Sequence, residues 1–149
     1  MKPVRTLIVV ADEEAARFLI NEGVGKGLQE ICVVSISQLD EGTLEFADRP
    51  GRSSAGSKVV GRHGMDPRTD LEENNRAKFA SHVIEALDQE WKAAKADRLV
   101  VAAPPKMLGE LRSRLSGAPA AALAGDLAKD LVNVPLNDLP GHFADILAV

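Results

Sequence analysis

The run Leu7-Ile8-Val9-Val10-Ala11 is the segment that most restricts how this chain can fold. It is short, rich in β-branched residues and free of polar side chains, which is the pattern of a strand buried on both faces of a sheet. A second such strand is predicted over residues 98–103, just before Pro104 and Pro105. Together with the helical patterns between and after these strands, the two runs predict an α/β fold with a mixed sheet.

Residues 13–21, which come after the first strand, allow two interpretations. Glu, Ala, Arg and Leu are good helix formers, so propensity alone favours a short helix. The alternative is a hairpin with Asp12 at its turn and the side chains of residues 17–20 alternating between two faces. We favour the hairpin because the segment is short and leads into a glycine-rich turn at residues 23–27. A third strand is predicted over residues 31–36, where Cys32 is expected to be a small buried hydrophobe.

A long helix is predicted after Pro67, because Thr69 and Asp70 can both cap it, and it is expected to run to about residue 96. Its apolar face is formed by residues at helical spacing, namely Phe79, Ala80, Val83, Ile84, Leu87 and Trp91.

Shorter elements are predicted in the C-terminal third of the chain. A helix should begin at Pro105, and the segment 116–119, with Gly117 and a following proline, should stop it. Residues 120–134 fit either a strand pair or a helical turn. Asn137 or Asp138 is expected to cap a last helix that reaches the C-terminus.

Residues 49–68 break the regular alternation of strands and helices. They have no apolar period, and they hold four of the twelve glycines together with several serines. Five basic residues and one acidic residue give the segment a charge of +4, which leaves −8 on the other 129 residues of a chain whose total is −4. Long segments of this kind inside compact domains are usually functional or disordered. We therefore predict a long, flexible and exposed basic loop.

Composition and motifs exclude several classes of protein. The 149 residues have the length of one domain, and we expect residues 1–149 to form one. A single cysteine rules out an internal disulfide, and with three scattered histidines it predicts no metal site. No apolar run reaches the ~18 residues of a membrane span and the N-terminus has no signal-peptide pattern, so we expect a cytoplasmic protein. Nucleotide-binding glycine motifs and a nucleophile elbow are missing as well, so no cofactor and no catalytic residue is predicted.

One candidate site is the corner formed by Pro104, Pro105 and Lys106, where a strand ends and a helix begins. Ligands of open α/β sheets collect at that edge, and a helix N-terminus with a lysine favours an anion. Gly109 belongs to the same corner, and Asp12 comes directly after the other buried strand. An enzyme that uses Asp12 or Lys106 at the strand ends is one hypothesis, although the sequence offers no recognisable acid–base pair. The alternative is a rigid proline corner that only turns the chain.

The basic loop is the second candidate site. Its residues for contact with phosphates or RNA are Arg49, Arg52, Lys58, Arg62, His63 and Arg68. Flexible basic arms of Gly, Ser and Arg bind phosphates in a manner that weakens steeply with salt. Stacking on bases is not expected, because all five aromatic residues lie outside the loop. The competing interpretation is a solvated insertion without a partner.

The order of features resembles the bacterial host-attachment family, whose members are described as required for attachment to host cells. The most specific match is the string Ala103-Pro104-Pro105-Lys106-Met107-Leu108-Gly109-Glu110-Leu111-Arg112. Supporting matches lie in residues 10–19, in the Arg/Gly/Ser loop, in residues 77–80 and in residues 129–131. The resemblance covers almost the whole chain. It implies a role in attachment that, for a cytoplasmic chain, is indirect and carried out by binding an unidentified partner. The alternative is a ribosome- or RNA-associated factor that acts through Arg52, Lys58, Arg62 and His63 of the basic loop.

That family is in turn similar, more distantly, to the central domain of eukaryotic and archaeal peptide-chain release factors and of the Pelota rescue factor. This resemblance implies an N-terminal β-meander with a hairpin at residues 6–21, a long loop, a long helix, and then strand, helix, strand and helix, with a strand near 121–130. In release factors the corresponding loop carries a Gly-Gly-Gln tripeptide that promotes peptidyl-tRNA hydrolysis. Residues 49–68 contain no Gly-Gly pair and no glutamine. Release-type catalysis is therefore not expected, whereas contact of the basic loop with the ribosome or RNA stays open as an alternative.

Overall fold

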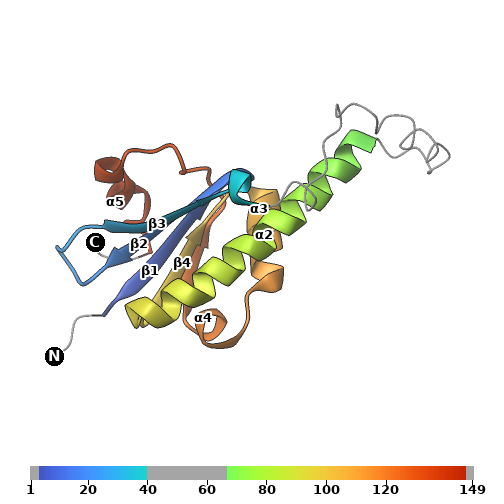
Figure 1. The fold of residues 1–149 in the computed structure, drawn as a ribbon. Coiled ribbons are helices and arrows are strands. Elements are labelled where there is room, and N and C mark those ends of the chain that lie inside the picture. Colours follow the sequence, from blue (N-terminus) through green and yellow to red (C-terminus); the bar gives the residue numbers. More distant parts are fainter. Residues whose placement is uncertain (1–3, 40–66, 147–149) are drawn as a thin grey trace.

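The fold is built on a five-stranded sheet, seen in a computed structural model that describes residues 4–39 and 67–146 (Figure 1). The strand order is β3-β2-β1-β4-β5, with β2 antiparallel to both of its neighbours and β1, β4 and β5 parallel to one another. The fold is thus α/β with a mixed sheet, as predicted. The strands are β1 (Thr6–Ala11), β2 (Ala15–Asn21), β3 (Gln29–Ser35), β4 (Arg98–Ala102) and β5 (Leu123–Leu127).

One long helix and several short ones accompany the sheet. The long helix, α2 (Pro67–Ala94), has 28 residues and is therefore about 42 Å long at 1.5 Å per residue. The other helices are α3 (Pro105–Arg114), α4 (Gly117–Ala121) and α5 (Leu139–His142), with 3-10 turns η1 (Ile36–Gln38) and η2 (Leu136–Asp138). Throughout the described ranges, each helix is too short or too polar to cross a bilayer.

The central strand β1 is buried on both faces, and its side chains enter two separate cores. Leu7 and Val9 pack under α2 and α3, whereas Ile8 and Val10 pack under the C-terminal segment that contains α5. Figure 1 shows α2 and α5 on opposite faces of the sheet. The apolar run at residues 7–11 therefore has the two-sided burial that its pattern predicts.

The hairpin interpretation of residues 6–21 is confirmed. Strand β1 pairs with β2 from Thr6↔Asn21 to Ala11↔Ala16, and β3 continues the meander. A strand also lies in the segment 120–134, where β5 pairs with β4 in parallel. Cys32 lies in β3 and packs against the α2-side core, but it is only partly buried.

The predicted boundaries of two helices are wrong. Thr69 and Asp70 lie within α2 rather than before it, so the first two residues of this helix take the last two positions of the predicted loop 49–68. Helix α3 ends at Arg114, and Gly117, with φ of 68°, begins the unpredicted helix α4 instead of ending α3.

The last predicted helix is also shorter than expected. It consists of the single turn α5, and Asp138 precedes it without a side-chain capping hydrogen bond. The physical reason lies in Pro140 and Gly141, because a proline fits only the first turn of a helix and a glycine disfavours the helical conformation of the next turn.

Candidate functional site

The carboxyl edge of the sheet, defined here as the edge where β1, β4 and β5 end, brings the predicted corner together. Because these three strands are parallel, Asp12 and Pro104 come after neighbouring strands at the same edge. Strand β2 begins at this edge and β3 ends there, since Ala15 pairs with Ser35. In open α/β sheets, such an edge is the usual place for a ligand.

Asp12 builds the turn between β1 and β2. Its Oδ1 atom accepts hydrogen bonds from the backbone N–H groups of Glu14 and Ala15, both at 2.7 Å. The Asp12 N–H in turn donates to the Ala15 carbonyl at 2.9 Å. One oxygen of this carboxylate is thus committed to holding the hairpin, which is the usual role of Asp in a tight turn.

The Pro104-Pro105-Lys106 corner joins β4 to α3. Pro105 occupies the first turn of α3, where its missing N–H leaves no hydrogen bond unmade, and the Pro104 carbonyl accepts a bond from the Leu108 N–H at 2.8 Å. Lys106 is exposed beside the positive end of the helix dipole. Gly109 is exposed on α3, where an added Cβ would meet no atom within 4 Å.

An ion pair that the sequence pattern does not reveal fixes α2 to this edge. Nε of Arg76 lies 3.1 Å from Oε2 of Glu13 in the β1–β2 turn, and the Arg76 side chain is only 9% exposed against 42% for Glu13. A signal for Arg76 exists in the sequence, because it lies three residues before Phe79, on the spacing of the apolar stripe. The sequence does not reveal that Glu13 is its partner, because 62 residues lie between Glu13 and Arg76.

The pair with Glu13 also marks which part of α2 lies beside the β1–β2 turn. Residues 67–75 precede Arg76 in the helix and extend about 14 Å past the β1–β2 turn. Figure 1 shows this end of α2 projecting from the side of the molecule on which β3 ends. Leu39 and Pro67, which flank residues 40–66, therefore both lie on the carboxyl-edge side.

Most residues of the second candidate site lie outside the described ranges. Arg68 belongs to the first turn of α2. The remaining candidates for contact with phosphates, all outside the described residues, are Arg49, Arg52, Lys58, Arg62 and His63.

Arg17 is a further polar residue with a role in the structure, and its position in the sequence does not reveal that role. Its Nε donates to Oε1 of Glu30 at 2.7 Å, and one terminal nitrogen donates to the carbonyls of Val132 and Val134 at 3.0 and 2.7 Å. The side chain is 12% exposed. Arg17 thus ties the segment before α5 to the sheet, which is a structural role.

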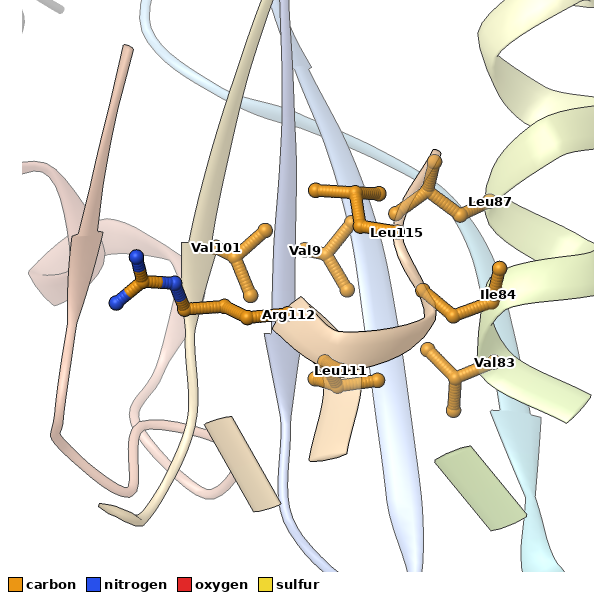
Figure 2. A pocket seen from close by; sticks show the side chains of 8 residues that line it. All are labelled: Val9, Val83, Ile84, Leu87, Val101, Leu111, Arg112 and Leu115. Atoms are coloured by element: carbon orange, nitrogen blue, oxygen red, sulfur yellow. The ribbon is translucent and has the colours of Figure 1, made fainter. Parts of the chain in front are cut away.

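A small pocket between α2, α3 and the sheet offers no room for a ligand. Figure 2 shows that its walls are aliphatic, with the guanidinium of Arg112 directed away from them. Its volume is ≈ 10 Å³, about the least that can hold one water. The pocket is therefore a packing gap in the core. It is lined by Val9, Val83, Ile84, Leu87, Val101, Leu111, Arg112 and Leu115.

Neither metal ligands nor a reactive thiol supply a further site. In the part of the chain that the structure describes, no three His, Cys, Asp or Glu side chains are grouped in a way that could hold a metal. Burial raises the pKa of the Cys32 thiol, and the carboxylate of Glu90 raises it further. A thiol with a raised pKa carries less of the nucleophilic thiolate at neutral pH, which fits a structural cysteine.

Comparison with known structures gives distant similarities. The chain is similar to the archaeal translation termination factor aRF1 (TM-score 0.44, 12% identity), covering 85% of this chain and 31% of that one. It is similar to a structure described as an archaeal protein (TM-score 0.48, 10% identity, 97% and 35% covered). It is also similar to ParM of Bacillus thuringiensis with ATP (TM-score 0.46, 12% identity, 87% and 42% covered). The chain thus spans between 31% and 42% of the length of these structures.

Comparison with protein families is more direct. None of the curated proteins compared matches the chain. A family model described as "Protein required for attachment to host cells" matches residues 7–143, which include nearly all of the five-stranded sheet. The chain therefore belongs to the family of proteins required for attachment to host cells.

Proposed function

We propose that this chain serves host attachment indirectly, as an intracellular protein that binds RNA or the ribosome through its basic segment, residues 49–68. The observation that carries the proposal is the separation of charge. The segment has a charge of +4, whereas the other 129 residues together have −8. A basic segment on an acidic body attracts a polyanion locally without making the whole protein a nonspecific nucleic-acid binder.

The described residues on either side of residues 40–66 support this function. Leu39 and Pro67 lie on the carboxyl-edge side of the sheet, where Lys106 is also exposed. Of the three acidic residues of the nearby turn, Asp12 accepts two backbone N–H groups and Glu13 pairs with Arg76, whereas Glu14 is exposed. Both interactions reduce the repulsion that a phosphate backbone would meet at this edge.

The composition of the segment favours phosphate contact over base recognition. Residues 49–68 contain arginine, lysine, serine and glycine but no Phe, Tyr or Trp side chain on which a base could stack. Phosphate contacts release counterions, so the binding should weaken steeply as salt rises. We therefore expect little sequence preference and a strong dependence on ionic strength.

Co-sedimentation with ribosomes at low and moderate salt tests the proposal. The wild-type chain should sediment with ribosomes at low salt, and changing Arg52, Lys58 and Arg62 together to Glu should abolish this. The matched control changes Lys26, Lys92 and Lys95 to Glu, three exposed lysines near the opposite edge of the sheet. Absence of association at low salt, or equal loss in both triple variants, would overturn the proposal.

The cellular location is tested separately. Antibody detection in fractionated cells should find the chain in the cytosolic fraction. Its presence in the culture medium or on the cell surface would favour direct contact with the host and contradict an indirect role.

A further inference from the structure

We propose that the chain forms a weak symmetric dimer by antiparallel pairing of β3 with β3 of a second copy. Within residues 4–39 and 67–146, β3 is an outer strand of the sheet, since only β2 lies beside it in the strand order. Two of the four large hydrophobic side chains that are exposed in the described structure belong to it, namely Ile31 (40% exposed) and Val33 (50% exposed). An outer strand with apolar side chains and unpaired backbone groups is a template for another strand.

The hydrogen-bond pattern identifies which backbone groups face outward. The Ile36 N–H donates to the Glu14 carbonyl on the side of the neighbouring strand at 2.7 Å. Counting back in steps of two, Val34 and Cys32 also direct their backbone N–H and C=O groups toward β2, where they lie opposite Ala16 and Phe18. In an antiparallel pair, the residues between these turn their N–H and C=O groups away from the neighbouring strand. Ser35 is one of them, and its N–H is bonded by Oε1 of Gln38 at 3.3 Å. Val33 is the other, and it lies at the centre of the open edge.

The edge is suited to a second copy because Val33 turns its backbone groups outward and the one charge of the strand is compensated. A two-fold axis at Val33 would give two reciprocal N–H···O=C bonds between the Val33 residues and would place Cys32 opposite Val34. Glu30 is the one charged residue of β3, and Arg17 of the same chain already holds its carboxylate at 2.7 Å. Two copies would therefore meet without the like-charge repulsion that lysines usually provide on outer strands.

The other outer strand, β5, is less available. Ile146 packs over Gly125 so closely that a Cβ there would lie 2.8 Å from Ile146 Cγ2. All but one residue of β5 are partly covered, whereas four of the seven residues of β3 are exposed. The register shift of β3 between its pairings with Phe18 and Leu19 limits the regular edge to residues 32–35. So short a contact is smaller than the ~1,000 Å² of a stable interface, and the dimer should form only at high concentration.

Sedimentation equilibrium over a concentration series up to about 1 mM tests the dimer. At about 1 mM, even a dimer with a Kd near 1 mM is substantially populated. The wild-type mass should rise toward that of a dimer, and Val33→Lys should hold the protein at the monomer mass. Val24→Lys is the matched control, because Val24 is 78% exposed in the β2–β3 turn, away from the edge. A wild-type monomer at every concentration, or equal effects of the two variants, would overturn the proposal.

Hydrogen exchange gives a second readout that needs no substitution. The Val33 amide should exchange more slowly as the concentration rises, by roughly two-fold once half of the protein is dimeric and by more as dimer accumulates, because only the monomer exposes this N–H. The Val24 amide should not change. A dimer that forms with no protection of Val33 would place the interface elsewhere. Protection of Val33 only when a lysate is added, with no self-association, would indicate an extended segment of another protein and would also contradict the proposal.

Discussion

Arg76 of α2 and Glu13 of the β1–β2 turn form an ion pair at 3.1 Å that fixes the long helix to the carboxyl edge. The pair is unequal, since the arginine side chain is 9% exposed and the glutamate side chain 42%. A buried guanidinium without its counterion is unfavourable, whereas an exposed carboxylate without its partner is solvated.

This inequality predicts that removal of the exposed partner is the more harmful change. Glu13→Gln should lower the free energy of unfolding by about 1–2 kcal/mol, because it leaves the buried charge of Arg76 unpaired. Arg76→Met should lower it by less than about 1 kcal/mol, because the charge is removed together with the pair. Urea unfolding checks the order of the two effects. A larger loss in Arg76→Met would contradict this view of the pair.

A substitution of Arg17 should instead loosen the segment before α5. Arg17→Lys should lower the free energy of unfolding by about 2 kcal/mol, because a lysine cannot reproduce the fork that binds Glu30 and two carbonyls. Exchange at the Val134 amide, which donates to the Leu131 carbonyl at 3.1 Å, should become faster. Arg112→Lys is the control, because Arg112 is 59% exposed and its pair with Asp126 should contribute less than about 0.5 kcal/mol. Equal losses in both variants would argue against a special role for Arg17.

Alanine substitutions at two glycines should change the stability of the protein in opposite directions. Gly125→Ala should destabilise the protein by about 1–3 kcal/mol, because the new Cβ would lie 2.8 Å from Ile146 Cγ2. Gly109→Ala should stabilise it by about 0.5–1 kcal/mol, because the Cβ on helix α3 meets no atom within 4 Å. Thermal unfolding measures both variants. If Ile146→Ala fails to lessen the loss in Gly125→Ala, the close contact is not its cause.

The strand-end corner predicts an anion effect at Lys106. Inorganic phosphate in the millimolar range should shift the amide resonances of Lys106 and Met107 at the start of α3, and Lys106→Ala should weaken this response several-fold. Lys129→Ala is the matched control, because Lys129 is also exposed and lies just after β5. No shift in the millimolar range, or the same response in Lys106→Ala, would leave the corner with only its structural role.

The sequence predicts the central elements well because their signals are local. The run at residues 7–11 has the unbroken apolar pattern of a strand buried on both faces, and Phe79, Val83 and Leu87 repeat at helical spacing and are all buried. For the hairpin, the short length of residues 13–21 outweighs a propensity that favours a helix. The pattern of β5 alone allows either a strand or a helical turn, and the family resemblance implies the strand.

The remaining features depend on contacts between distant residues. The local sequence around Gly117 does not show whether this glycine ends α3 or begins α4, because a glycine with a positive φ is compatible with both positions. The partners of Arg17 and Arg76 lie on other elements, so their roles could not be read from spacing. Of the candidate sites, the structure places Asp12 and the residues 104–106 at one edge, while the basic residues from Arg49 to His63 lie outside the described ranges.

The salt dependence of RNA binding measures the phosphate contacts that we propose for residues 49–68. Binding of a fluorescent single-stranded RNA should weaken with salt at a log–log slope of about −2 to −3.5, as expected for three to five phosphate contacts. Changing Arg52, Lys58 and Arg62 to Glu should weaken binding at low salt by at least about ten-fold and leave a slope no steeper than about −1.5. The Lys26, Lys92 and Lys95 variant should bind like the wild type. An unchanged affinity and slope in the Arg52, Lys58 and Arg62 variant would contradict RNA binding through residues 49–68.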